Sequence, residues 1–218
     1  MTILIADDHK NMLNSIKLIS EFAFECEQEI TFVECTNCQD AIEKTDYFLS
    51  KKRSFDLAIL DYMMPPYFEK NILNGGEICL YLQKVMPSCK TLINTGLLED
   101  FVLFEIDQKI KPDALILKSD LDADQFIEVI RDLISGKKFR SQYVLDKVSK
   151  LWESEIFINE QNRLIVLLIS KGFKIKEIAQ ELALSETAIN KRILKIKKTL
   201  DITDDTSILK EAKKRGYI

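Results

Sequence analysis

Short apolar segments alternate with amphipathic segments over the first 136 residues of the chain. The apolar segments are Thr2–Asp7, Ile30–Thr36, Leu57–Tyr62, Thr91–Gly96 and Ala114–Lys118. Because they lack polar alternation, each is typical of a parallel strand that is covered on both faces. The segments near residues 10–23, 38–52, 76–86, 98–110 and 122–135 have the spacing of amphipathic helices. This alternation predicts an α/β domain over residues 1–136 with a doubly wound, five-stranded parallel sheet.

The pattern changes after residue 136. Residues 137–157 are predicted to form a linker, with a helix over Tyr143–Trp152. Beyond it the helical segments are Gln161–Lys171, Lys174–Leu182, Ser185–Leu200 and Ser207–Arg215, separated by short turns. None of the sequence after the linker has the character of a strand. Residues 158–218 are therefore predicted to form an all-α, four-helix domain.

Charge is distributed unevenly over the 218 residues, although the net formal charge is only −4. Residues 1–149 contain 17 Lys and Arg against 25 Asp and Glu, a net charge of −8. Residues 150–218 contain 14 against 10, a net charge of +4. An acidic first part and a basic second part favour two domains, of which the second is able to approach a polyanion.

The cysteines and the apolar runs indicate the compartment. No run approaches the ~18 apolar residues of a membrane span, and no export signal is found, so we expect a cytoplasmic protein that does not enter a membrane. Five cysteines are then expected to be reduced. Cys35 and Cys38 form a C-x-x-C pair, which suits either thiol chemistry, half of a zinc site, or two ordinary buried residues.

Polar side chains follow the predicted strands at the points where they end. Asp7 and Asp8 follow the first strand, Asp61 lies late in the third, Thr95 ends the fourth and Lys118 ends the fifth. In an open α/β sheet these carboxyl ends share one crevice. Three carboxylates there call for a hard cation such as Mg²⁺, while a lysine and a hydroxyl suit a phosphoryl group. The pattern predicts a carboxylate that is phosphorylated with metal assistance.

Residues 1–136 resemble the receiver domain of bacterial two-component response regulators, which has a flavodoxin-like fold. The matching segments are Ile3–His9 (ILIADDH), Asp56–Pro65 (DLAILDYMMP), Asn94–Gly96 (NTG) and Leu115–Lys118 (LILK). The resemblance implies that Asp61 is the phosphoacceptor and receives the phosphoryl group from a sensor histidine kinase.

The same resemblance assigns the metal ligands. It implies that Mg²⁺ is bound by Asp8, by Asp61 and by the backbone carbonyl of Met63, with Asp7 contributing through water.

The resemblance also assigns the residues that respond to phosphorylation. Lys118 would pair with the phosphoryl oxygens, Thr95 would turn its hydroxyl towards them, and Gly96 would leave room for the group. The chain departs from the receiver pattern at Leu115, which occupies the position of an aromatic switch residue. It departs again in the loop of residues 66–76, which is several residues longer than the pattern and could shield the acyl phosphate or shape kinase docking.

The basic end of the chain has the pattern of a helix-turn-helix. Ser185 is a natural N-cap for the helix that follows it. Isoleucine and leucine recur along this helix at spacings of four, three and four residues, at positions 189, 193, 196 and 200, and lysines occupy another face. A helix with cations outward and aliphatic side chains inward matches a recognition helix, which contacts phosphates and base edges.

Residues 158–218 resemble the LuxR/FixJ-type helix-turn-helix output domain. The matching segments are Ile165–Gly172 (IVLLISKG), Ile175–Leu184 (IKEIAQELAL), Ser185–Ile189 (SETAI) and Ala212–Ile218 (AKKRGYI). By position, the residues implied to face DNA bases are Asn190, Lys191 and Leu194. Those implied to contact the DNA backbone are Arg192, Lys195 and Lys198.

Together the two resemblances indicate a NarL/FixJ-type response regulator and transcription factor that is not an enzyme. Phosphorylation would control dimerisation and binding to promoter half-sites. A hydrolase that uses Asp61 as a nucleophile is a rival, but such phosphatases need a second Asp two residues on, where this chain has Met63. The other rival is a phosphorylation-independent regulator or adaptor, which Leu115 and the long loop favour.

Overall fold

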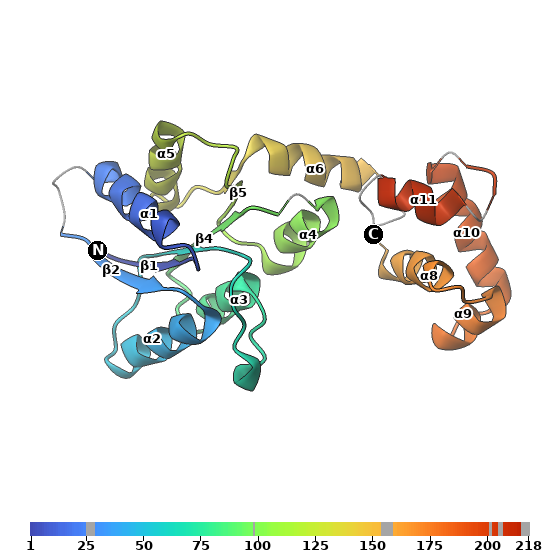
Figure 1. The fold of residues 1–218 in the computed structure, drawn as a ribbon, viewed down its shortest axis with the longest axis horizontal. Coiled ribbons are helices and arrows are strands. Elements are labelled where there is room, and N and C mark those ends of the chain that lie inside the picture. The colour runs from blue at the N-terminus through green and yellow to red at the C-terminus, as the bar shows by residue number, and fades with distance from the viewer. Residues whose placement is uncertain (25–28, 98, 154–158, 201, 205–206, 215–218) are drawn as a thin grey trace. The chain divides into compact units, whose positions relative to one another are not determined.

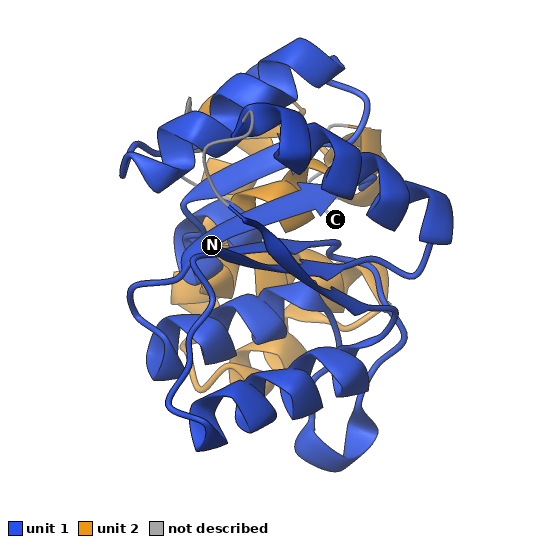
Figure 2. Ribbon diagram, turned by 90° about the vertical axis from the view of Figure 1, so that its left-hand side faces the viewer, with its two compact units in different colours: residues 1–98, 105–145 blue, residues 99–104, 146–218 orange. Residues whose placement is uncertain are grey.

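The computed structural model describes residues 1–24, 29–97, 99–153, 159–200, 202–204 and 207–214. The chain divides into two compact units, which Figure 2 shows in two colours. Unit 1 comprises residues 1–98 and 105–145, and unit 2 comprises residues 99–104 and 146–218.

Unit 1 is built on a parallel sheet, which has six strands among the described residues. The strands are β1 (Thr2–Ala6), β2 (Thr31–Cys35), β3 (Leu57–Leu60), β4 (Lys90–Thr95), β5 (Ala114–Leu117) and β6 (Phe139–Arg140). Their order is β2-β1-β3-β4-β5-β6, and every neighbouring pair is parallel. The doubly wound architecture and the five predicted strands are confirmed, and the topology brings the carboxyl ends of β1, β3, β4 and β5 to one edge.

The predicted number of strands was wrong, because part of the expected linker joins the sheet as β6. Phe139 N donates to Asp113 O at 3.0 Å, and Ser141 N donates to Leu115 O at 3.1 Å. Arg140 forms an ion pair with Asp107 and donates to backbone carbonyls of the same segment. A strand of two residues is too short to show a strand period in the sequence, so only the edge of β5 defines it.

Helices cover both faces of the sheet (Figure 1). The first pair, α1 (Lys10–Ala23) and α5 (Ala123–Ile134), covers one face, and the second pair, α2 (Cys38–Ser50) and α3 (Gly75–Val85), covers the other. The other helical segments before residue 154 are η1 (Phe68–Lys70), α4 (Asp100–Glu105), the π-helical turn η2 (Ile106–Ile110) and α6 (Gln142–Glu153). On the α1 and α5 side, aliphatic side chains from both helices join those of the strands in a continuous core.

Side-chain caps explain where α2, α3 and α5 begin. Asn37 Oδ1 accepts from Asp40 N at 2.8 Å before α2, and Asn74 Oδ1 accepts from Gly76 N at 2.9 Å before α3. Asp122 and Gln125 form a reciprocal capping box at α5. Each cap satisfies backbone N–H groups that have no partner within the helix.

Unit 2 contains the predicted four-helix arrangement. The helices are α8 (Glu160–Ser170), α9 (Ile175–Glu181), α10 (Glu186–Leu200) and α11 (Ser207–Lys214). The stripe on α10 is buried as predicted and packs with apolar side chains of the other three helices. Ser185 Oγ accepts from Ala188 N at 3.2 Å and so caps α10. Among the helices of the described residues, none combines the length and the apolar character that crossing a membrane requires.

The cysteine pair lies where β2 gives way to α2. Both Cys35 and Cys38 are buried, and burial raises the pKa of Cys35 to about 12 and that of Cys38 to about 11. Thiols with such pKa values stay protonated at neutral pH, and the thiolate is the form that attacks disulfides or binds metal. The environment therefore favours a packing role for this pair.

Candidate functional site

The polar residues predicted from the strand ends lie along one edge of the sheet. Asp7 and Asp8 follow β1, Asp61 follows β3, Thr95 ends β4 and Lys118 follows β5. The side chain of Asp7 is 1% exposed and that of Asp61 is 5% exposed. Burying two carboxylates is costly unless a counter-charge accompanies them.

Lys118 supplies this counter-charge. Its Nζ donates to Asp7 Oδ2 at 2.7 Å and to Asp61 Oδ2 at 2.9 Å. Burial alone lowers the pKa of the Lys118 ammonium, but the hydrogen bonds to the two carboxylates outweigh burial and leave the pKa raised. Lys118 therefore carries its charge at the position where a phosphoryl group on Asp61 would need a cation.

The negative charge of Asp61 is only partly compensated by Lys118. Burial raises the pKa of its carboxyl, the hydrogen bond from Lys118 lowers it, and repulsion from Asp7 raises it, so that the net shift is upward. Met63 N donates to the other carboxylate oxygen, Oδ1, at 3.3 Å. The pocket thus holds an excess of negative charge that one lysine does not remove, and a further cation would stabilise it.

The first acidic pair completes a group that suits a hard cation. Asp7, Asp8, His9 and Asp61 each offer one ligand atom, and these atoms all lie within 4.8 Å of one another. Asp8 is exposed at the rim, and its Oδ1 lies 2.6 Å from His9 Nδ1. Asp7 Oδ1 accepts from His9 N at 2.9 Å, which directs that carboxylate into the group. Three carboxylates within this distance match the oxygen ligands that Mg²⁺ prefers.

Thr95 and Gly96 lie beside this group at the end of β4. Thr95 is fully buried, and its Oγ1 accepts from Leu97 N at 3.1 Å. Its carbonyl accepts from Lys118 N at 2.8 Å, which links the ends of β4 and β5. A Cβ placed on Gly96 would have no described neighbour within 4 Å, so the space beside this residue is open.

Leu115, at the position of the aromatic switch residue, is fully buried within β5. It pairs with Arg140 of β6 in the sheet register. Its neighbours Ala114 and Ile116 join the core on the α1 and α5 side, so the Leu115 side chain points to the opposite face of the sheet, where it is also buried.

Gly75 is a positioning residue that was not predicted from the sequence. Gly75 is the first residue of α3, and its N–H donates to Tyr62 O at 2.9 Å. A Cβ at this position would lie 1.9 Å from Asp61 O and 2.9 Å from Asp61 C, both backbone atoms. Only glycine lets the start of α3 approach the Asp61 backbone so closely. The signal available in the sequence was a Gly-Gly pair directly after an Asn cap.

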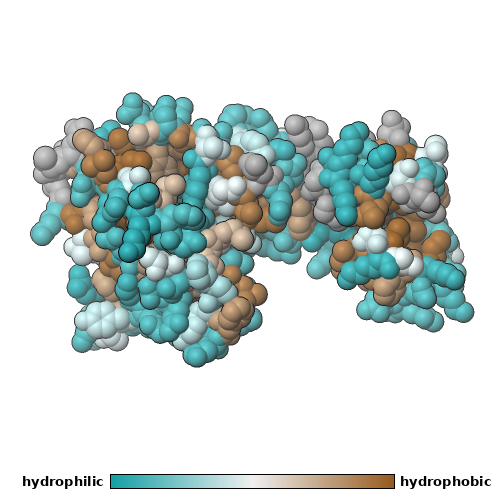
Figure 3. All heavy atoms as spheres, in the orientation of Figure 1, coloured by the Kyte–Doolittle hydropathy of each residue, from teal (hydrophilic) through white to brown (hydrophobic). Residues whose placement is uncertain are grey.

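The long loop after Pro65 is an ordered hairpin. Tyr67 and Ile72 form an antiparallel bridge, with hydrogen bonds of 2.7 and 3.1 Å. Lys70 Nζ lies 2.8 Å from Asp46 Oδ2, and Tyr81 donates its hydroxyl to the same carboxylate. Phe68 at the tip is 77% exposed, and Figure 3 shows hydrophobic residues on the surface of this unit. Asp46 is therefore the anchor that holds the hairpin against α2 and α3.

Five of the six residues implied to contact DNA are exposed on α10. They are Asn190, Lys191, Leu194, Lys195 and Lys198. Leu194 is 63% exposed. These side chains form one continuous face of α10, which we call the α10 face.

Arg192, the sixth residue, lies away from the α10 face. Its guanidinium donates to Asn162 Oδ1 at 2.8 Å, to Gln161 Oε1 at 2.7 Å and to Asn159 Oδ1 at 3.2 Å. Asn162 is 5% exposed, and the bond from Arg192 to it is partly buried. In this structure Arg192 joins α10 to the beginning of α8, a role that the sequence alone did not suggest.

We predict that Arg192→Ala destabilises unit 2 by about 2 kcal/mol, because charge-assisted hydrogen bonds to partly buried groups are lost. Hydrogen–deuterium exchange of the α8 and α10 amides in the full chain measures this directly. Lys195→Ala is the matched control, since it removes an exposed cation from the same helix and should leave exchange unchanged. Equal protection in both variants would contradict the bridging role.

The fold and the site together define a class of protein: a parallel α/β unit with an acidic, lysine-bridged pocket, joined to a helix-turn-helix unit. No protein-family model matches the chain. It is 24% identical to the transcriptional regulatory protein DesR of Bacillus subtilis, over all of this chain and 98% of that protein. It is 25% identical to the oxygen regulatory protein NreC of Staphylococcus epidermidis, over all of this chain and 99% of that protein.

Solved structures show the same fold. A complex of the two-component response regulator RcsB with DNA matches with a TM-score of 0.63 and 20% identity, over 98% of both chains. RcsB from Salmonella enterica serovar Typhimurium, bound to promoter P1flhDC with the phosphomimetic BeF₃⁻, matches with a TM-score of 0.63 and 22% identity, over 97% of both chains. Over its whole length the chain is therefore similar in sequence to bacterial regulatory proteins such as DesR and NreC, and it shares the fold of the RcsB structures.

Proposed function

We propose that this protein is a two-component response regulator that is phosphorylated on Asp61 by a sensor histidine kinase and then binds promoter DNA. A receiver domain over residues 1–136, a linker over 137–157 and an output domain over 158–218 would divide these tasks. The observation that carries the proposal is the Lys118 ammonium, which bonds both Asp7 and Asp61 at the carboxyl edge of the sheet. We place this activity in the cytoplasm.

The proposed reaction transfers a phosphoryl group from a histidine nitrogen to a carboxylate oxygen. An Asp61 oxygen attacks phosphorus, the P–N bond of the phosphohistidine breaks, and its electron pair stays on the imidazole. Mg²⁺ bound by Asp8, Asp61 and the Met63 carbonyl, with Asp7 acting through water, would neutralise the transferring group. Lys118 then pairs with a phosphoryl oxygen, and the Thr95 hydroxyl donates to another.

The proposed output is binding of DNA by the α10 face. Its lysines would contact phosphates, while Asn190, Lys191 and Leu194 would meet base edges. One small module binds DNA weakly, so we propose that phosphorylation favours a homodimer on two promoter half-sites. The coupling would begin at Thr95 and Lys118, whose backbones are joined by a hydrogen bond of 2.8 Å between β4 and β5.

Metal removal tests the first half of the proposal. With acetyl phosphate and MgCl₂, we expect the full chain to become phosphorylated, as resolved on a phosphate-affinity gel. EDTA is expected to reduce the rate by about two orders of magnitude, since the acidic pocket then repels the incoming phosphate. Restoring excess MgCl₂ is the control for damage by the chelator. Equal rates with and without free Mg²⁺ would exclude the proposed metal assistance.

The hairpin of residues 66–74 gives a second prediction about the site. Asp46→Asn removes the carboxylate that holds Lys70 and Tyr81, and we expect the phosphorylated protein to lose its phosphoryl group a few times faster because water reaches Asp61 more easily. Release of inorganic phosphate measures the lifetime. Glu43→Gln, an equal change of charge on the exposed side of α2, is the control. Identical lifetimes in the two variants would limit the hairpin to surface structure.

A phosphorylation-independent regulator is the second candidate function. Leu115 favours it, because a fully buried leucine occupies the position of the aromatic switch residue. The affinity for promoter DNA, measured with and without BeF₃⁻ and Mg²⁺, distinguishes the two candidate functions. Affinity for promoter DNA that is unchanged by BeF₃⁻ and Mg²⁺ would support the second candidate, whereas tighter binding would support the first.

A further inference from the structure

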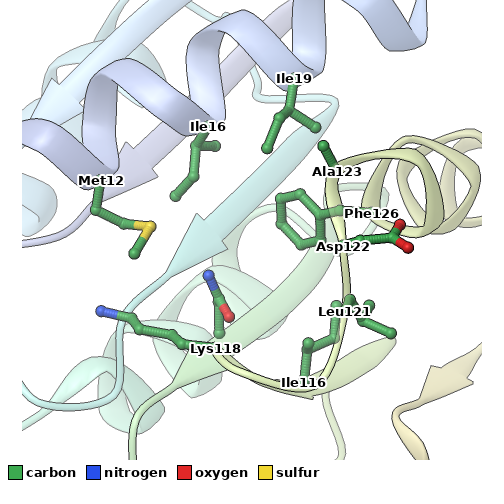
Figure 4. Close-up of a pocket in the computed structure, with 10 residues that line it drawn as sticks. Met12, Ile16, Ile19, Ile116, Lys118, Leu121, Asp122, Ala123 and Phe126 are labelled. Carbon is green, nitrogen blue, oxygen red and sulfur yellow. The ribbon is translucent and has the colours of Figure 1, made fainter.

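A small cavity lies between α1 and α5, behind the ends of β4 and β5. Its volume is about 120 Å³. Apolar side chains form most of its wall, as Figure 4 shows: Met12, Ile16, Ile19, Ile116, Leu121 and Phe126. These residues belong to unit 1, and most of them also contribute to or pack against its core. The cavity is thus an opening in an apolar layer that is otherwise close-packed.

One polar residue interrupts this apolar wall. Asn94, on β4, lines the cavity and is 6% exposed. Among the described residues, no hydrogen bond is formed by its side-chain amide, although an amide offers two donors and an acceptor. Leaving a buried amide without a partner costs free energy, and such groups in folded proteins are nearly always satisfied. The amide therefore indicates a polar group that occupies the cavity when the protein is in use.

The charges at the cavity indicate a neutral occupant. Lys118 lines the cavity, but its Nζ already bonds Asp7 and Asp61. Asp122 also lines it, and its carboxylate accepts from Gln125 N at 2.8 Å as the cap of α5. A carboxylate in the cavity would meet three acidic groups near one lysine, and an ammonium would compete with Lys118 for the same oxygens. An uncharged hydroxyl or carbonyl group avoids both the repulsion by the acidic groups and the competition with Lys118.

We propose that this cavity binds a small neutral molecule with a compact aliphatic body and one hydroxyl or carbonyl group, which hydrogen-bonds to the Asn94 amide. An engineered apolar cavity of ~150 Å³ holds benzene, so the present one suits about six non-hydrogen atoms. Short branched alcohols and cyclic ketones have this size and polarity. Their aliphatic part would pack against the apolar side chains of the cavity wall, and their oxygen would hydrogen-bond to the Asn94 amide.

The position of Lys118 connects this site to Asp61. The Lys118 stem lines the cavity, while its ammonium bonds the proposed phosphoacceptor. A molecule in the cavity restricts the stem and so changes how readily Lys118 leaves Asp7 for a phosphoryl group. By reciprocity, phosphorylation changes the affinity of the cavity by the same factor. This coupling rests on the proposed function, whereas binding itself does not.

Binding is tested on the unphosphorylated full chain with 3-methylbutan-1-ol as the probe. In NMR titrations up to tens of millimolar alcohol, we expect saturable shifts of the Asn94 side-chain amide and of the Met12 and Leu121 methyl groups. Asn94→Leu keeps the size of the side chain but removes the amide. We expect it to weaken binding about fivefold, which corresponds to the net contribution of one hydrogen bond to the affinity. Shifts that do not saturate, or an affinity unchanged by Asn94→Leu, would overturn the proposal.

A second pair of variants distinguishes a loss of binding from a loss of folding. Ala123→Phe adds bulk at an exposed first-turn position that lines the cavity, and should abolish the saturable shifts. Asp124→Phe adds the same bulk to the neighbouring position, which does not line the cavity, and should bind like the parent. Equal binding by both would contradict the site. For the coupling, the affinity for the alcohol is compared between the unphosphorylated chain and the chain whose phosphorylation by acetyl phosphate is verified on a phosphate-affinity gel. An equal affinity of the two forms would remove the coupling alone.

Discussion

Replacing Asp61 with asparagine is expected to lower phosphorylation by acetyl phosphate by more than about two orders of magnitude, because a neutral amide oxygen is a poor nucleophile. The substitution keeps the shape of the side chain and an oxygen for Lys118, whose Nζ lies 2.9 Å from Asp61 Oδ2. We therefore expect the fold to be retained. A phosphate-affinity gel measures the labelling, and the thermal midpoint of unfolding, measured in parallel, tests that the protein remains folded.

The control for this variant is Asp132→Asn. Asp132 lies on the exposed side of α5, where it pairs with Lys137 at 2.8 Å. The change removes the same charge from the same unit, so labelling should be as in the parent. Persistent labelling of Asp61→Asn, with a phosphopeptide that maps elsewhere, would move the acceptor to another residue. Loss of labelling in both variants would point to a general effect of charge.

Gly75→Ala is expected to have the second largest effect, because the new Cβ would lie 1.9 Å from the carbonyl oxygen of Asp61. The neighbour is backbone, so the start of α3 or the end of β3 has to move by more than an ångström. Overpacking of this kind costs about 3 kcal/mol in the free energy of unfolding. Because the displaced backbone carries Asp61, we also expect phosphorylation to slow by at least about tenfold.

The matched substitution is Gly96→Ala, which adds the same methyl group at another strand end of the same unit. Since no described atom lies within 4 Å of a Cβ there, its free energy of unfolding should match that of the parent. Urea denaturation compares the two variants, and the rate of labelling by acetyl phosphate is measured on Gly75→Ala. A Gly75→Ala protein as stable and as reactive as the parent would show that α3 adapts without cost.

Elements that are buried along a regular pattern of positions have a local signal in the sequence. The five long strands and the α10 stripe were predicted correctly, because burial on both faces or on one helical face imposes a period on the sequence. The two-residue strand β6 has no period of its own. It exists because Phe139 N and Ser141 N find acceptors on the free edge of β5. Such a strand is defined by its partner and cannot be predicted from its residues.

The same distinction applies to the site residues. Asp7, Asp8, Asp61, Thr95 and Lys118 could be grouped from the sequence, because parallel strands bring their carboxyl ends to one edge whatever the details of packing. Arg192 was placed with the residues that contact the DNA backbone by its position in the LuxR/FixJ resemblance, and such a position does not determine the partners of its side chain. The acceptors offered by Asn159, Gln161 and Asn162 on a different helix determine where its guanidinium lies.

The sequence by itself therefore determined the sheet, the order of its polar strand ends and the two-part organisation, all of which follow from hydrophobic period and chain direction. Only the tertiary structure decided which backbone atoms lie close to Gly75 and which acceptors bind Arg192. It also decided that the Asn94 amide, which has no hydrogen-bond partner in the described part of the chain, lines a cavity. These features depend on distances between segments far apart in the chain. A pattern of residue types constrains such distances to several ångströms, whereas steric overlap and hydrogen bonding change over fractions of one.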